Sequence, residues 1–153
     1  MKLAESTITD RDLVGHAQHC TVKARQAASS RHGWEFMGYV GAALVTDRGS
    51  LFTGINISLL CGIGFCAEHS AVAEMVRAGE TRIRKIVATT AQGSILPPCG
   101  RCRELLYQID SANIDTVVLL PGERRQTLGE LLPDNWQPHF DKPLADNAGA
   151  GES

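Results

Sequence analysis

The sequence predicts an α/β fold in which helices cover both faces of a mixed β-sheet. Three observations lead to this prediction. Two largely apolar strands joined by a short polar turn come first and form a hairpin over residues 39–55. Helices then alternate with strands, which is the pattern of a sheet between helical layers. The length of 153 residues suits one domain with a substantial core.

The first helix is expected from Thr9 to about residue 29. Thr9 can cap it, Asp10 and Asp12 suit the positive end of the helix dipole, and small apolar residues recur at helical spacing. Residues 30–38 are expected to form a loop. Strands are predicted at 39–46 and 51–55, with the turn between them in Asp-Arg-Gly-Ser and an irregular loop after them.

The second half alternates regularly between helix and strand. Gly79 provides a stop signal for one helix, and two consecutive prolines precede the next. The last strand has no polar alternation, so we expect it to be buried on both faces. The predicted elements are a helix from 66 to 78, a strand at 83–90, a loop at 91–98, a helix at 99–109, a strand at 116–120 and a helix at 127–132.

Composition limits the classes of function. We expect a single domain over residues 1–140 and a mobile polar tail over 141–153. The net charge of −2 and the lack of a basic stretch argue against nucleic acid as the main partner. No apolar run approaches the ~20 residues that span a bilayer. The polar N-terminus does not resemble a signal peptide, so a cytoplasmic location is expected.

Two short segments carry the chemistry: Cys66-Ala67-Glu68 and Pro98-Cys99-Gly100-Arg101-Cys102. The cysteine count of five is odd, which disfavours a disulfide framework. Three thiolates leave one corner of a tetrahedral zinc open, as a catalytic zinc requires. A carboxylate beside the metal that does not bind it can move protons. We therefore expect zinc on Cys66, Cys99 and Cys102, with Glu68 as the catalytic residue.

Both segments begin predicted helices, where free N–H groups and the helix dipole favour a thiolate over a thiol. Arg103 and His69 are candidates to add hydrogen bonds around the ligands. A structural zinc site would need a fourth protein ligand, and Cys61 lacks the paired spacing for that role. A thioredoxin-like Cys-x-x-Cys would come earlier in the chain.

Cys-x-Glu followed by Pro-Cys-x-x-Cys is the signature of the zinc-dependent nucleoside and base deaminases. Over roughly residues 10–136 the chain resembles the small, single-domain cytidine deaminases. That resemblance implies a three-layer α/β/α sandwich with a five-stranded mixed sheet, a zinc cofactor and a homotetramer. The segments that carry it are Val40-Gly41-Ala42-Ala43-Leu44, Phe52-Thr53-Gly54-Ile55-Asn56, Cys66-Ala67-Glu68, Pro98-Cys99-Gly100-Arg101-Cys102-Arg103 and Glu130-Leu131-Leu132-Pro133.

The resemblance also implies substrate contacts. Asn56 matches the asparagine that binds ribose, and Trp136 matches an aromatic residue that covers the base. The backbone carbonyl of Ala67 is a candidate to orient the amino group. Ser58 stands where the family has a glutamate on the ribose, and it remains a candidate contact.

Other departures concern the size of the site. Gly38 and Gly62 stand where aromatic residues are expected, and His69 replaces an arginine. The blasticidin S deaminases share the altered loop and closely match the segment from Ile95 to Arg103. The site is therefore expected to take a substrate bulkier than cytidine or differently substituted.

The expected reaction is hydrolytic deamination of a cytosine-type nucleoside or analogue, with Glu68 moving the protons. Two alternatives stay open. The chain could be a zinc-binding scaffold without catalysis, although such a scaffold would not need Glu68. It could also deaminate an aminopurine base or a polynucleotide, against which the absence of a basic stripe argues.

Overall fold

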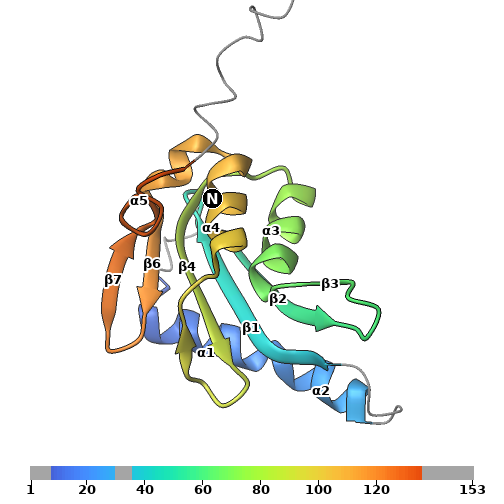
Figure 1. The fold of residues 1–153 in the computed structure, drawn as a ribbon. Helices are drawn as coiled ribbons and strands as arrows, with labels where there is room; N and C mark the ends of the chain where they lie inside the picture. Colours follow the sequence, from blue (N-terminus) through green and yellow to red (C-terminus); the bar gives the residue numbers. More distant parts are fainter. Residues whose placement is uncertain (1–7, 30–35, 136–153) are drawn as a thin grey trace, which may run out of the picture.

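The computed structural model describes residues 8–29 and 36–135, and these residues form a mixed sheet between helices (Figure 1). The fold class predicted from the sequence is confirmed. In chain order the elements are α1 (Asp10–His19), α2 (Thr21–Ser29), β1 (Phe36–Thr46), β2 (Leu51–Ser58), β3 (Gly64–Phe65), α3 (Ala67–Arg77), β4 (Ile83–Thr90), β5 (Ile95–Leu96), α4 (Gly100–Ile109), a 3₁₀ helix (Ser111–Asp115), β6 (Val117–Leu120), β7 (Arg124–Thr127) and α5 (Leu128–Leu131).

The sheet follows the strand order β3-β2-β1-β4-β6-β7, and β5 pairs with β4 outside that path. Pairs β1–β2 and β1–β4 are antiparallel, and β4–β6 is parallel. Successive side chains of β1 point to opposite faces of the sheet, so the core has one layer on each face. Ala42 and Leu44 pack with α3 and α4, whereas Ala43 and Val45 pack with α1.

Among residues 8–29 and 36–135 the sheet contains seven strands, whereas the resemblance implied five. Three of the seven strands are absent from the elements predicted from the sequence, and all three are short: β3 and β5 have two residues each and β7 has four. β3 and β5 lie in segments that were predicted to be loops, because strands of two residues show no periodicity. β7 is charged rather than apolar, so its sequence also lacks the usual strand signal.

The single helix expected over residues 9–29 is two helices. α1 ends at His19, and a turn at Cys20 separates it from α2. The Cys20 thiol donates to the carbonyl oxygens of Ala17 (3.1 Å) and Gly54 (3.2 Å), so the turn is joined to the sheet. Helical periodicity continues through this turn, which is why the sequence did not reveal it.

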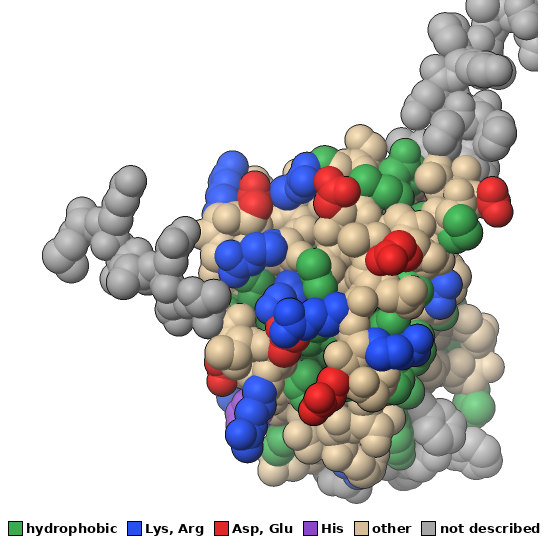
Figure 2. Space-filling model, turned by 90° about the vertical axis from the view of Figure 1, so that its left-hand side faces the viewer, with side chains coloured by type: hydrophobic (Ala, Val, Ile, Leu, Met, Phe, Trp, Pro, Cys, Tyr) green, Lys and Arg blue, Asp and Glu red, His purple; other side chains and the backbone are tan. Residues whose placement is uncertain are grey.

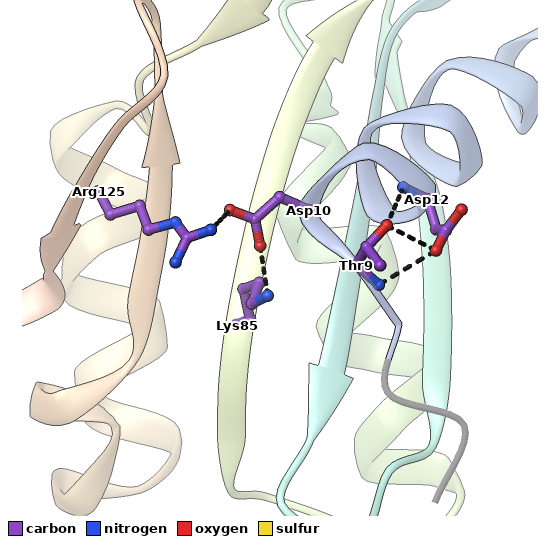
Figure 3. Close-up of polar contacts among 5 residues, drawn as sticks. All are labelled: Thr9, Asp10, Asp12, Lys85 and Arg125. Atoms are coloured by element: carbon purple, nitrogen blue, oxygen red, sulfur yellow. Dashed lines mark hydrogen bonds and ion pairs between the residues drawn. The ribbon is translucent and has the colours of Figure 1, made fainter.

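The start of α1 is joined to two strands through Asp10, whose carboxylate pairs with Lys85 on β4 and with Arg125 on β7, the latter at 2.5 Å (Figure 3). Thr9 and Asp12 form the reciprocal hydrogen bonds of a capping box, which confirms the predicted cap.

The β7 edge of the sheet carries lysine and arginine side chains with acidic side chains between them (Figure 2). Charges on an edge strand discourage pairing with another chain. Within the described part of the chain, no helix is long and apolar enough to cross a membrane.

Candidate active site

Three cysteine side chains meet at the starts of two neighbouring helices. Cys66 is the N-cap of α3, Cys99 is the N-cap of α4, and Cys102 lies in the first turn of α4. The Cys66 and Cys99 sulfurs are 3.7 Å apart, and the Cys99 and Cys102 sulfurs are 3.4 Å apart. All three sulfur atoms lie within 4.8 Å of one another, so one metal ion can contact them together.

The chemistry of this cluster fits zinc. Burial raises the pKa of the Cys102 thiol far above its usual range, and the nearby Glu68 carboxylate raises it further. Burial also raises the pKa of Cys99, but hydrogen bonds from the backbone N–H and thiol of Cys102 outweigh it and lower that pKa. Burial also raises the pKa of the Cys66 thiol, so a cation would be needed for all three cysteines to bind as thiolates, and three sulfur ligands match a catalytic zinc with one open position.

The other two cysteines lie away from the cluster. The Cys20 thiol points at backbone carbonyls of α1 and the sheet, and burial raises its pKa. Cys61 is exposed in the loop between β2 and β3. Neither belongs to the group of side chains whose sulfur atoms come together.

The carboxyl group of Glu68 is buried beside the cysteine cluster. Glu68 lies in the first turn of α3, two residues after Cys66, and is only 5% exposed. Burial raises the pKa of this carboxyl group, against hydrogen bonds from its own backbone N–H and from Cys102. Burying a carboxyl group has a free-energy cost, so its position beside a metal cluster suggests a chemical role.

The cluster opens into a cavity of about 460 Å³. Cys66, Cys99 and Glu68 line it, while Cys102 is fully buried behind. Asn56, Ser58 and Ala67, the expected substrate contacts, also line this cavity. Trp136 lies outside the described residues. The apolar part of the wall comes chiefly from Val40, Leu59, Ile63, Phe65, Leu96 and Pro97.

Asn56 lines the cavity and also makes a hydrogen bond to strand β1. Its Oδ1 accepts a hydrogen bond of 2.8 Å from the backbone N–H of Val40. The pairing of β1 with β2 shifts register between Met37 and Gly41, next to this bond. Asn56 therefore fixes the strand irregularity that forms one side of the cavity.

The interpretation of Gly38 as open space in the site is wrong. Gly38 is buried, and a Cβ there would lie 2.8 Å from the Cβ of Ala24 on α2. It permits close packing of α2 on β1 and does not line the cavity. Gly62 does line the cavity, and a Cβ there would meet no atom within 4 Å. The expected extra room is therefore present on the Gly62 side.

The two residues expected to support the ligands have other contacts. Arg103 donates from Nε to the Pro98 carbonyl (2.9 Å) and from Nη1 to the Leu131 carbonyl (2.8 Å), which joins the start of α4 to α5. His69 Nδ1 lies 3.4 Å from Nη2 of Arg101. The other ring nitrogen, Nε2, is buried and has no hydrogen-bond partner among the described residues.

Arg101 is a cavity residue that was not among the site residues predicted from the sequence. Its exposed side chain lines the cavity, and Nη2 donates to the Gly64 carbonyl at 3.3 Å. The sequence contained one indication that Arg101 belongs to the site. It lies between Cys99 and Cys102, two metal-ligand candidates, so its side chain begins beside the cavity.

Comparison with known proteins agrees with this geometry. Residues 15–120 match the family model described as the cytidine and deoxycytidylate deaminase zinc-binding region. A cytidine deaminase of Mycobacterium tuberculosis is 34% identical over 112 residues, which cover 72% of this chain and 82% of that protein. A probable cytidine deaminase of Dictyostelium discoideum is 31% identical over 98 residues, covering 61% of this chain and 65% of that protein.

Solved structures show the same similarity in three dimensions. The crystal structure of the cytidine deaminase from Mycobacterium tuberculosis has a TM-score of 0.63 and 29% identity, covering 84% of this chain and 98% of that one. The cytidine deaminase from Burkholderia pseudomallei has a TM-score of 0.65 and 28% identity, covering 83% of this chain and 98% of that one.

Proposed function

Because the chain belongs to the family of cytidine and deoxycytidylate deaminases and is a zinc-dependent hydrolytic deaminase, we propose that it acts on a nucleoside or nucleoside analogue with a cytosine-type ring. The amino group of the ring is replaced by oxygen from water and leaves as ammonia. The observation that carries the proposal is the buried Glu68 carboxyl group at the base of a 460 Å³ cavity, beside three cysteine sulfurs.

The site residues have separate roles in the reaction. Cys66, Cys99 and Cys102 would hold the zinc, which would act as a Lewis acid and make water reactive at neutral pH. Glu68 accepts the two protons of the attacking water in turn and delivers one to the ring nitrogen and the other to the departing amino group. The backbone carbonyl of Ala67 orients that amino group by accepting a hydrogen bond from it.

The remaining cavity residues select and hold the substrate. Asn56 and Ser58 contact the sugar side, and the apolar wall covers the ring. Arg103 and His69 act behind the ligands: Arg103 fixes the Pro98 carbonyl just before Cys99, and His69 contacts Arg101. A free nucleoside fits a cavity of about 460 Å³, and among the described residues that line it Arg101 is the one basic side chain, so there is no basic stripe for a polynucleotide backbone.

The cavity wall also supports self-association, and we propose a homo-oligomer, with four copies as the expected number. Leu60 and Ile63 are 72% and 70% exposed on the loop beside the cavity. Exposed apolar side chains grouped in this way are typical of surfaces that another chain covers. Light scattering at micromolar concentration should give a mass above the 16.5 kDa of one chain, and a single-chain mass would contradict the proposal.

The decisive experiment measures ammonia release by the zinc-loaded protein from cytosine nucleosides, aminopurine nucleosides and short single-stranded oligonucleotides. We expect release from at least one cytosine-type nucleoside and none from the oligonucleotides. Glu68→Gln should keep one zinc per chain and lose roughly 10²–10⁴-fold in kcat, the typical contribution of a proton-transfer residue. A Glu68→Gln protein with wild-type kcat would contradict the assigned role.

A further inference from the structure

One positive charge faces the cavity. Arg101 is the sole lysine or arginine among the described residues that line it, and Glu68 is the sole acidic residue. The two charges are at different depths, because Glu68 is 5% exposed whereas Arg101 is an exposed residue. A substrate whose ring reaches Glu68 therefore has its other end nearer to a guanidinium group.

The guanidinium group is held in place but retains donors. Nη2 donates to the Gly64 carbonyl at 3.3 Å and lies 3.4 Å from His69 Nδ1. Among the described residues, Nε and Nη1 of Arg101 have no acceptor. The carbonyl of β3 thus orients the group while two of its three nitrogens stay available for a ligand.

Arg101 also lacks an acidic partner among the described residues. Other arginines are paired, such as Arg125 with Asp10 at 2.5 Å and Arg82 with Asp115 at 3.7 Å. Cδ separates Nε from Nη1, so each of these two nitrogens can donate its own charge-assisted hydrogen bond to an oxygen of a carboxylate or a phosphate. A neutral sugar hydroxyl would use only part of that capacity.

We propose that Arg101 binds an anionic group of the substrate, a carboxylate or a phosphate, at the end away from the reacting ring. This inference rests on the proposed deaminase function and adds the charge of the substrate to it. It also gives a reason for Ser58: a carboxylate at position 58, on the same cavity wall, would repel such a group.

A different role for Arg101 would be to offset the charge of the cysteine thiolates. In that role the arginine would stabilise the metal site, and its loss would affect all substrates equally and reduce zinc content. The two roles therefore predict different effects of replacing Arg101: only the anion-binding role predicts a change in the ratio of kcat/KM for charged and neutral substrates.

The test measures kcat/KM on zinc-loaded protein for cytidine, cytidine 5′-monophosphate and the 5′-carboxylate analogue of cytidine. Wild type, Arg101→Gln, Arg101→Lys and Arg84→Gln are compared, with zinc content measured for each. Arg84 is exposed on β4 and does not line the cavity, so its variant removes the same charge elsewhere.

We expect Arg101→Gln to lower the ratio of anionic to neutral kcat/KM by about 10- to 100-fold, the range for a charged hydrogen bond. Arg101→Lys should keep part of the ratio and Arg84→Gln all of it. The analogue whose ratio falls, phosphate or carboxylate, identifies the anion. An unchanged ratio for both analogues would overturn the inference, whether or not zinc content falls. Absence of ammonia release from every compound would instead reject the proposed function.

Two further measurements keep the inference testable if Arg101→Gln does not fold. Binding of uridine and uridine 5′-monophosphate, which resemble products, can be titrated by calorimetry on wild type and Arg101→Lys. Raising NaCl from about 50 to 500 mM should weaken an anion–guanidinium contact but not uridine binding. Equal salt dependence for the charged and uncharged compounds, with equal affinities in both proteins, would also overturn the inference.

Discussion

Gly54 on β2 lies so close to Ala71 on α3 that a Cβ atom on residue 54 would be 2.3 Å from the Ala71 backbone nitrogen. The same atom would be 2.6 Å from the Ala67 carbonyl oxygen. These are backbone atoms, which cannot rotate away. The glycine therefore lets the first turns of α3, which carry Glu68, pack directly on the sheet.

We expect Gly54→Ala to lower the free energy of unfolding by at least the ~1–3 kcal/mol typical of overpacking and to displace the start of α3. Gly15→Ala is the matched control, because a Cβ at Gly15 meets nothing within 4 Å inside α1. That variant should gain up to about 1 kcal/mol from helix propensity. Urea unfolding of both variants provides the measurement, and a Gly54→Ala protein as stable as wild type would contradict the packing argument.

Metal content should depend on three cysteines only. Cys66→Ser, Cys99→Ser and Cys102→Ser should each lose most of their zinc, because each removes one of the three sulfurs that meet. Cys20→Ser and Cys61→Ser are the controls and should keep one zinc per chain. Elemental analysis after dialysis measures the content. Full retention in Cys102→Ser, or loss in Cys20→Ser, would show that the ligand set is different.

Unmodified cytidine should be a poor substrate. Ser58 provides a hydroxyl where a carboxylate would bind the ribose, and a charged hydrogen bond is worth ~1.5–3 kcal/mol, or roughly ten- to a hundredfold in kcat/KM. Gly62 leaves the same side of the cavity open. Ser58→Glu should raise kcat/KM for cytidine, while Ser58→Ala should change it little. A wild-type value of ~10⁵ M⁻¹s⁻¹ or more would mean that other groups hold the ribose.

Stability should fall in acid partly through Asp10. Partial burial raises the pKa of this carboxyl group, but Lys85 and Arg125 outweigh burial and hold it below its usual value. A lowered pKa in the folded state stabilises the protein at pH values above the unfolded pKa, about 4, and this contribution is lost as pH falls through the folded pKa. Asp10→Asn should cost about 1 kcal/mol at pH 7 and progressively less below pH 4.

Asp115→Asn is the matched control for that measurement. Asp115 pairs with Arg82 at 3.7 Å, but its side chain is 77% exposed, so the pair should contribute little. Thermal unfolding of the three proteins between pH 3 and 7 tests the expectation. A constant difference between wild type and Asp10→Asn across this range would show that the ion pairs do not cause it.

Sequence patterns predicted most of the long elements and the cysteine cluster, because both depend on local residues. The strand at Ile83–Thr90 has the predicted bounds, and Cys66 and Cys99 are at the predicted helix starts. The predictions that were wrong concern features that depend on contacts between residues far apart in the sequence. The end of α1 depends on how Cys20 meets Gly54, and β7 is a strand only because β6 lies beside it. Gly38 was placed in the site because nothing local shows that Ala24 packs against it.

The N-cap positions of Cys66 and Cys99 have a consequence for the evolution of the site. Neither side chain makes a capping hydrogen bond, although the best-placed residues there, such as serine or aspartate, stabilise a helix by typically ~1 kcal/mol. Each helix thus forgoes stability to present a sulfur atom. Without zinc, Cys66→Ser should therefore be at least as stable as wild type, so a lineage that lost the metal would face little thermodynamic resistance to losing this cysteine.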